Sequence, residues 1–271
     1  MKRLIICTFL ACVLLLIAAF GEKMCPYKPN VQTLSLSLRH PTLEHPMGTD
    51  RYGRDMLSRV IAGARVSIFS ALSLVAVTTI FGTAVGVTCG FCRGALDTFI
   101  MRFSDVCLAF PGLVFALFAA AVIKGGIVGA IIALAFVSWP KYARLSRSLV
   151  LALKERDFIF AAKLAGLTKT QIAIRHAIPN IIGEIAVTAA LDIGTMIMEL
   201  AGLSFLGLGA QPPTPEWGSM MSFGRSMFQT YPWVVLAPGS AIFISVVIFN
   251  MLGDAVRDYF DKRKVNFKLG G

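Results

Sequence analysis

Two acidic residues, Asp192 and Glu199, stand seven positions apart in an otherwise apolar stretch of the chain. A charged side chain inside a membrane-spanning helix costs about 2.5–3.5 kcal/mol on insertion scales, so such residues mark polar cavities. In a helix Asp192, Met196 and Glu199 share one face, and the two carboxylates lie about 10 Å apart along the axis. That is too far to chelate one ion together. We interpret this face as one wall of a translocation path for a cationic or zwitterionic solute.

A structural interpretation of the same residues stays open. Both carboxylates could pair with basic or amide groups inside a helix bundle, and Asn250 is a candidate partner. Met196 by itself is more often a core residue than a metal ligand. The predicted path therefore comprises Asp192, Met196, Glu199 and Asn250, with no assigned metal site.

The sequence motifs do not support nucleotide binding, hydrolytic catalysis or a zinc site in this chain. The chain has no GxxxxGK[ST] loop to hold ATP phosphates, and neither HExxH nor GxSxG occurs. Cys89 and Cys92 form one CxxC, but no second pair or nearby histidine completes a zinc site. The six cysteines are interpreted as packing residues, and no catalytic residue is predicted.

The composition is that of an integral membrane protein. Hydrophobic residues make up 56% of the chain, and the mean hydropathy is +0.73. The net charge of +11 does not indicate nucleic-acid binding, because no basic run with interleaved aromatics occurs. We predict an all-α membrane protein with six transmembrane helices. The predicted spans are 4–21, 66–92, 106–123, one beginning at 125–140, 181–206 and 233–253.

Two details complete the predicted topology. Residues 4–21 follow a short basic head and could be a signal peptide, but no clear cleavage site precedes Glu22, so an uncleaved first span is favoured. Only Lys124 separates the third and fourth spans, which predicts a helical hairpin. Basic residues concentrate on the side that holds both termini, which predicts that this side is cytoplasmic.

A polar, basic segment from Asp157 to Asn180 lies between two predicted spans. Phe158, Ala161, Ala162 and Ala165 fall on one helical face, and Gly166 ends that helix. Thr168 begins a second helix, and Gln171 completes a capping box. Pro179 is predicted to end that helix. The product is a helix-turn-helix at the membrane surface with small residues on one face.

This segment resembles the EAA loop of ABC importer permeases, with an Ala-Ala pair, a glycine four residues later and a following apolar-Pro pair. Phe160 replaces the leading glutamate of that family. The resemblance implies a coupling helix that docks into a cleft on a cytoplasmic ATPase. An ordinary amphipathic interfacial helix is the alternative. The implied docking residues are Phe160, Ala161, Ala162, Gly166, Thr168, Ile178 and Pro179.

Three further segments resemble the peptide/nickel branch of these permeases. Residues 48–59 read GTDRYGRDMLSR, residues 204–209 read SFLGLG before PTPEWG at 213–218, and residues 249–258 read FNMLGDAVRD. Gly48 and Gly53 suit tight turns, and Asp50 and Asp55 can cap helices or pair with arginines. We interpret residues 48–65 as a structural elbow rather than a substrate site. Residues 138–144 and 191–194 look more like nickel permeases than dipeptide permeases.

The resemblance implies a type I importer, MetI-like fold in the bacterial inner membrane. Its expected parts are an N-terminal helix and periplasmic segment (1–65), a permease domain (66–260) with a cytoplasmic coupling loop (148–180), and a cytoplasmic tail (261–271). The implied partners are a second homologous permease in a heterodimer, two ATPase subunits that bind ATP and Mg²⁺, an extracytoplasmic solute-binding protein and membrane lipid. This chain would hold no cofactor itself.

The implied solute is nickel, free or chelated, or a small peptide. A membrane enzyme is a competing class, but only Asp192 and Glu199 are available as converging catalytic groups. A self-contained channel or secondary transporter is another. It would leave the large basic segment at 157–180 unexplained, and no internal repeat is seen.

Overall fold

The protein is described by a computed structural model that covers residues 2–92, 94–109, 111–123 and 125–269, with side chains from residue 3 to residue 260. Within these residues, five helices are long and apolar enough to cross a membrane, and a bent pair makes a sixth candidate. The all-α membrane fold is confirmed. The long helices are α1 (Lys2–Met24), α2 (Met56–Cys92), α5 (Gly126–Leu153), α8 (Ile178–Phe205) and α10 (Trp233–Leu269).

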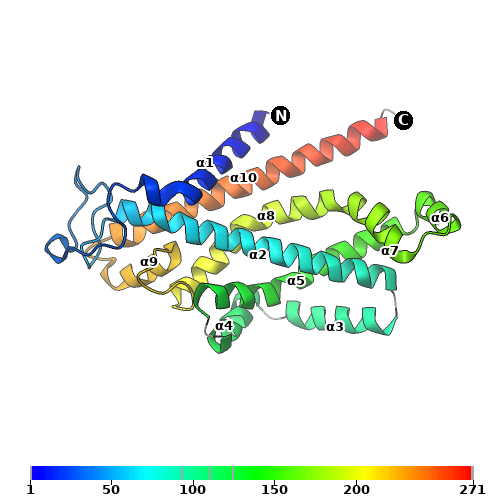
Figure 1. Cartoon of the computed structure of the whole chain (residues 1–271), viewed down its shortest axis with the longest axis horizontal. Helices are drawn as coiled ribbons and strands as arrows, with labels where there is room; N and C mark the ends of the chain where they lie inside the picture. The colour runs from blue at the N-terminus through cyan, green and yellow to red at the C-terminus, as the bar shows by residue number, and fades with distance from the viewer. Residues whose placement is uncertain (1, 93, 110, 124, 270–271) are drawn as a thin grey trace.

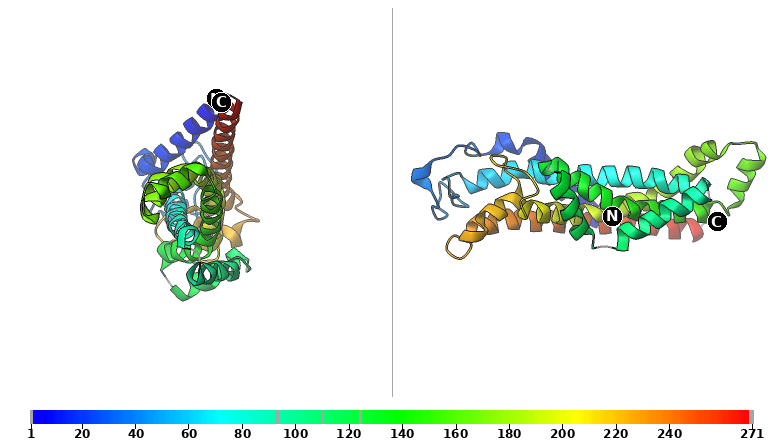
Figure 2. Two further views of the ribbon diagram at one scale, coloured as in Figure 1. Left: turned by 90° about the vertical axis from the view of Figure 1, so that its right-hand side faces the viewer. Right: turned by 90° about the horizontal axis from the view of Figure 1, so that it is seen from below.

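The helices form an elongated bundle with distinct ends (Figures 1 and 2). One end carries the cap, which we define as residues 25–55 and 206–232, including η1 (Leu34–Leu36), α9 (Trp217–Gly224) and η3 (Arg225–Met227). The other end carries the hairpin, residues 157–172, made of α6 (Asp157–Leu164) and α7 (Lys169–Ile172). Helix α1 packs along α10 in the opposite direction, so both chain ends point toward the hairpin end.

Helices α2 and α5 make the closest packing in the bundle through glycines on α2 at every fourth position. A Cβ atom at Gly82 would lie 2.5 Å from the Trp139 carbonyl oxygen, and one at Gly86 would lie 2.1 Å from that of Ala143. A Cβ at Gly90 would lie 2.7 Å from the Val150 side chain. Small residues at this spacing let membrane helices approach closely, where lipid supplies no hydrophobic driving force between them.

The predicted third span is wrong as a single helix. Residues 106–123 are divided between α3 (Ala95–Ala109) and α4 (Gly112–Ile123), whose axes differ by 98°. Pro111 lies at the break; it lacks an N–H and disfavours helix in the preceding residue. The stretch between the second and third predicted spans is also helical from Ala95, where α3 begins. Lys124, at the predicted hairpin turn, lies outside the described residues, although α4 and α5 do pack together.

Other helix boundaries extend beyond the predicted apolar runs. Helix α2 begins at Met56, ten residues before the predicted start, because Asp55 caps it. The fourth span begins as predicted, and α5 continues through Pro140 to Leu153. Neighbouring helices can compensate for the backbone bond that proline removes in a membrane helix. Helix α10 continues to Leu269, so the predicted tail is mostly an extension of the last helix.

Candidate functional site

The hairpin is built by local bonds that the sequence predicts. Gly166, at φ +81°, ends α6, and its N–H donates to the Lys163 carbonyl (3.0 Å) while that of Leu167 donates to the Ala162 carbonyl (3.2 Å). This is the Schellman arrangement. At the start of α7, Thr168 Oγ1 accepts from the Gln171 N–H and the Gln171 side chain accepts from the Thr168 N–H. The predicted glycine turn and capping box are both confirmed.

One side of the hairpin is anchored to the bundle. Ile159 and Ala162 of α6 are buried, as is Ile172 of α7. They belong to a second apolar cluster that includes Phe91 at the end of α2 and Val150 near the end of α5. The buried side of the hairpin is therefore continuous with the packing of these two spans.

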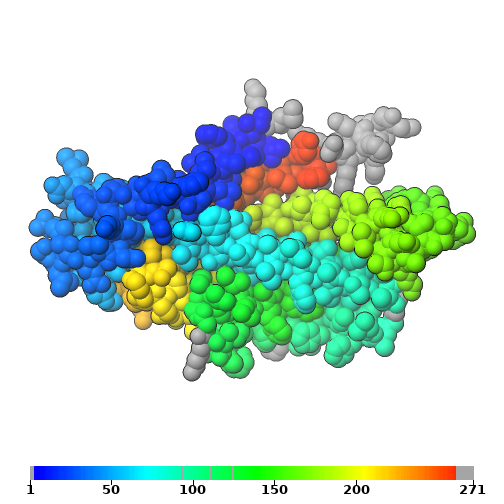
Figure 3. All heavy atoms as spheres, in the orientation of Figure 1, coloured from blue at the N-terminus to red at the C-terminus, as the bar shows by residue number. Residues whose placement is uncertain are grey.

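The opposite side of α6 is an apolar ridge open to solvent. Phe160 is 62% exposed and Leu164 is 76% exposed, and they lie one turn apart. The hairpin forms a projecting knob in the space-filling view (Figure 3). The predicted small-residue face is divided: Ala161 and Ala165 are exposed, whereas Ala162 is buried. The prediction missed the ridge because it followed the alanines rather than the larger residues beside them.

Pro179 does not end the second helix of this segment, so that prediction is wrong. A π-helical turn, η2 (Ala173–Ala177), joins α7 to α8 without a break. The Ile178 N–H donates to the Ala173 carbonyl, five residues back. Pro179 then occupies the first turn of α8, where the missing N–H costs little. Ile178 and Pro179 thus begin a span, and Ile178 packs against the second apolar cluster.

The carboxylate of Asp192 has two partners that the sequence analysis did not assign. It accepts a hydrogen bond from Lys141 Nζ at 2.6 Å on one oxygen and from the Tyr142 hydroxyl at 2.8 Å on the other. The Asp192 side chain is 8% exposed, whereas that of Lys141 is 51% exposed. The charged group that this site presents to its surroundings is therefore an ammonium. A lysine directly after the apolar run of α5 was the available signal.

The other predicted path residues are only partly brought together. Glu199 is half-buried on the same face of α8 and has no hydrogen bond or ion pair among the described residues. Met196 is 4% exposed and lies in the main apolar core, which argues against a role as a ligand. Asn250 is exposed on α10 and lies against Gly194 of α8, where a Cβ would be 2.3 Å from Asn250 Oδ1. Asp192 pairs with Lys141 and Tyr142, not with Asn250.

A cavity of about 630 Å³ lies between α5, α8 and α10. Its lining includes Leu145 of α5, the face of α8 between Pro179 and Leu191, and Arg257 of α10. Leu145 is one helical turn from Lys141, and Thr188, also in the lining, is one turn from Asp192. We call this cavity the vestibule. It begins near the hairpin end of α8, and its lining ends one helical turn from the Lys141–Asp192 pair.

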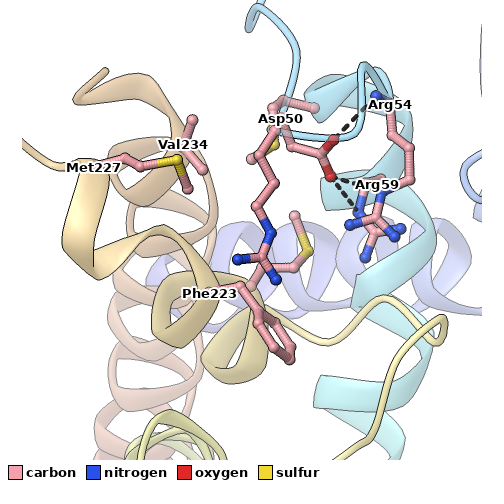
Figure 4. Close-up of a pocket in the computed structure, with 9 residues that line it drawn as sticks. Asp50, Arg54, Arg59, Phe223, Met227 and Val234 are labelled. Carbon is pink, nitrogen blue, oxygen red and sulfur yellow. Dashed lines mark hydrogen bonds and ion pairs between the residues drawn. The ribbon is translucent and has the colours of Figure 1, made fainter. Parts of the chain in front are cut away.

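The cap has a different character, with polar groups that satisfy one another. Asp50 accepts from Arg54 Nε at 2.6 Å and lies 3.8 Å from Arg59 Nε, as Figure 4 shows. Asp55 caps α2 through the Ser58 N–H (2.7 Å) and contacts His45 Nδ1 at 2.9 Å. The adjoining pocket, closed by Phe223, Met227 and Val234, holds about 20 Å³, room for one water and no solute.

The PEWG segment fastens α9 to α2. Glu216, which is 2% exposed, accepts from the Gly218 and Ser219 N–H groups at 2.8 Å each and from Ser67 Oγ. Trp217 is also buried, and its Nε1 donates to the Val60 carbonyl at 2.8 Å. Trp217 is therefore a packing residue between α9 and α2. Gly63 leaves the space for its indole, which a Cβ would approach to 3.1 Å.

Comparisons with known proteins agree on one class. The family of binding-protein-dependent transport system inner membrane components matches residues 82–266. The dipeptide transport system permease protein DppC of Alkalihalophilus pseudofirmus is 41% identical over 92% of this chain and 82% of its own length. The nickel transport system permease protein NikC of Escherichia coli K12 is 38% identical, covering 93% and 91%.

Two more comparisons concern a third relative and the fold. The glutathione transport system permease protein GsiD of Escherichia coli O6 is 40% identical over 93% of this chain and 83% of its own length. Among solved structures, an inward-facing conformation of the MetNI methionine ABC transporter matches with a TM-score of 0.60 and 18% identity. The match covers 75% of this chain and 97% of that one, and it supports the MetI-like fold.

Proposed function

This chain belongs to the family of binding-protein-dependent transport system inner membrane components. From that membership we propose the roles in import of the hairpin and of the path along α5 and α8. It is a multi-pass inner-membrane permease subunit of an ABC importer. It is not itself an enzyme, because ATP hydrolysis belongs to partner subunits. An extracytoplasmic binding protein is the other general partner of such a permease.

The hairpin is the docking element for an ATPase subunit. The observation that carries this proposal is the exposed ridge of Phe160 and Leu164 on a helix whose other side is buried in the bundle. An apolar ridge on a short helix outside the membrane costs free energy unless a partner's groove covers it. Closure of the ATPase dimer would then move the hairpin and, through Phe91 and Val150, the ends of α2 and α5.

A charge on the ridge tests this role. We expect Leu164→Glu to reduce co-purification of the ATPase with the permease at least tenfold while membrane insertion stays normal, because the groove would have to desolvate a carboxylate. The matched control is Leu43→Glu, the same change at a fully exposed leucine in the cap. Equal ATPase recovery from the two variants would refute docking through the ridge.

The path runs along α5 and α8, from Glu199 past the Lys141–Asp192 pair to the vestibule. A half-exposed ammonium in the middle of a span requires protein or water beside it rather than lipid. This supports a second, homologous permease subunit that closes the path from the other side, and two ATPases below. With the hairpin on the cytoplasmic side, both termini are cytoplasmic as well.

The solutes of this path are nickel, free or chelated, or small peptides. The named relatives are dipeptide, nickel and glutathione permeases, and they support this range without choosing within it. Asp192→Asn combined with Glu199→Gln removes both carboxylates at nearly constant size. We expect this pair to reduce uptake but to leave complex assembly and basal ATPase activity intact. Loss of assembly together with uptake would show instead that the two acids are structural.

A further inference from the structure

We propose that Lys141 is a specificity-determining residue of the path: its ammonium binds the carboxylate of the passing solute, while Glu199 receives the solute's own ammonium. This inference rests on the proposed function, since it needs α5 and α8 to line the path. It implies that the permease itself selects short zwitterionic peptides over bare metal cations.

The depth and exposure of Lys141 place its charge in a water-filled or protein-lined space. It stands about half-way along the 28 residues of α5, and its side chain is 51% exposed. A lysine at the centre of a span does not face lipid without a cost of several kcal/mol. The ammonium is held by Asp192, which lies at the middle of α8, so it does not extend along the helix toward the headgroups.

The bonding around Asp192 leaves the ammonium as the available charge. Both carboxylate oxygens of Asp192 are engaged, one by Lys141 and one by the Tyr142 hydroxyl. An ammonium has three N–H donors, and the described residues engage one of those on Lys141. Asp192 and Tyr142 therefore hold Lys141 in position, and the free donors of Lys141 point to a solute carboxylate. A bare divalent cation would meet like charge at this point.

Glu199 supplies the complementary charge at a matching distance. It lies seven residues from Asp192 on α8, which is about 10 Å along the axis and nearly the same helical face. An extended peptide of two or three residues spans about 7–10 Å. Such a peptide can place its carboxylate at Lys141 and its ammonium at Glu199. A single metal ion cannot use both groups at once.

The vestibule provides the exit from this station. Its lining reaches Leu145 and Thr188, each one turn from the Lys141–Asp192 pair. The charged residues in its lining, Glu184 and Arg257, lie farther toward the hairpin end. A solute released from Lys141 therefore enters a cavity of about 630 Å³ that holds groups of both signs.

A charge-rescue experiment tests the role of Lys141 in the assembled transporter. The parent has its six native cysteines replaced and is used only after its uptake is shown to equal that of the wild type. We expect Lys141→Cys to lower uptake of trialanine about tenfold or more, the effect of losing a hydrogen bond to a charged group. Treatment with 2-aminoethyl methanethiosulfonate, which restores an ammonium, should recover uptake. Methyl methanethiosulfonate, which leaves the position neutral, should not.

Two further arms separate selection from a structural role. Trialanine should protect the cysteine at position 141 from labelling, and trialanine amide, which lacks the carboxylate, should protect it much less. Lys23→Gln, the loss of an exposed lysine outside the path, is the matched control and should leave uptake unchanged. Nickel uptake should not fall in Lys141→Cys if the transporter accepts Ni²⁺ at all.

The outcomes that overturn the proposal differ from those that overturn the proposed function. No labelling of the cysteine at position 141 by water-soluble reagents would place Lys141 outside the path. Wild-type trialanine uptake in Lys141→Cys, or equal recovery by the neutral reagent, would remove its role in selection. ATPase subunits are recovered from the same samples. Their loss only from Lys141→Cys would make Lys141 an assembly residue, whereas the proposed docking is tested independently by Leu164→Glu.

Discussion

The cap and the hairpin lie at opposite ends of the bundle and use polar and apolar residues in opposite ways. In the cap, three charged residues beside the start of α2 are buried and paired within the chain: Asp50, Arg54 and Asp55 are each less than 8% exposed. In the hairpin, the charged residues are solvated and large apolar residues are exposed. A buried polar network completes itself, whereas an exposed apolar ridge requires another surface.

This difference in burial distinguishes a motif that stabilises the fold from a motif that binds a partner. The residues 48–59 are the longest recognisable motif, but their polar groups hold the start of α2 and enclose a pocket too small for a solute. The hairpin has few polar contacts with the rest of the chain; its capping box and glycine turn are internal to it. The hairpin therefore leaves its apolar ridge available to a partner, whereas residues 48–59 use their polar groups within the chain.

The largest effect is expected from a test of whether these two regions lie on opposite sides of the membrane. Single cysteines at Thr170 in the hairpin and Thr214 in the cap are both at exposed positions. In a cysteine-free parent, a membrane-impermeant maleimide should label only the Thr214 variant in intact cells and both variants after permeabilisation. Labelling of both in intact cells would refute the six-span topology.

The next effect concerns the stability of the cap. Asp55→Ala removes the α2 cap and leaves His45 and Ser58 with a buried unpaired group, which should lower the free energy of unfolding by about 2–4 kcal/mol. Thermal unfolding of the detergent-solubilised chain measures it. Glu44→Ala, an exposed change in the same loop, is the control. A similar midpoint for the two variants would show that the cap network is not structural.

The hairpin should respond through its partner rather than through global stability. Gly166→Val imposes a side chain at φ +81°, at a cost of about 1–3 kcal/mol, although no atom lies within 4 Å of the added Cβ. We expect normal insertion but loss of ATPase association and uptake. Thr170→Val, at an exposed position in helix α7 of the same hairpin, controls for the change in side chain. Wild-type uptake in Gly166→Val would contradict docking.

Local signals explain what the sequence could predict in these regions. The glycine turn at Gly166, the capping box at Thr168 and the Asp55 cap depend on residues within a few positions of each other, and all three are confirmed. Long apolar runs predicted the membrane spans for the same reason. Family resemblance supplied the class of transporter, which physical patterns alone left open.

Features set by distant contacts were missed. Asp192 and Lys141 are fifty-one positions apart in the sequence, and no neighbouring residue of either one indicates that they pair. The burial of Trp217 depends on the space left by Gly63. Pro111 and Pro179 were misread because proline breaks, bends or begins a helix according to its tertiary context. The exposed ridge could have been found by marking the large apolar residues beside the alanines of α6.

The smallest effect is expected from removing a helix N-cap in the hairpin, the same kind of change that Asp55→Ala makes in the cap. Thr168→Ala removes the hydroxyl that caps α7, at a cost of about 1 kcal/mol, and Thr168→Ser keeps it. Since the hairpin is anchored by Ile159 and Ile172, the global unfolding midpoint should not change measurably. The cost should appear as about fivefold weaker ATPase association in Thr168→Ala alone, measured by titrating the ATPase onto reconstituted permease.

Equal weakening in both variants would mean that the threonine methyl group, not the cap, contacts the partner. A lower unfolding midpoint in Thr168→Ala would mean that the hairpin is part of the structural core, as the cap is, and would remove the distinction between the two regions.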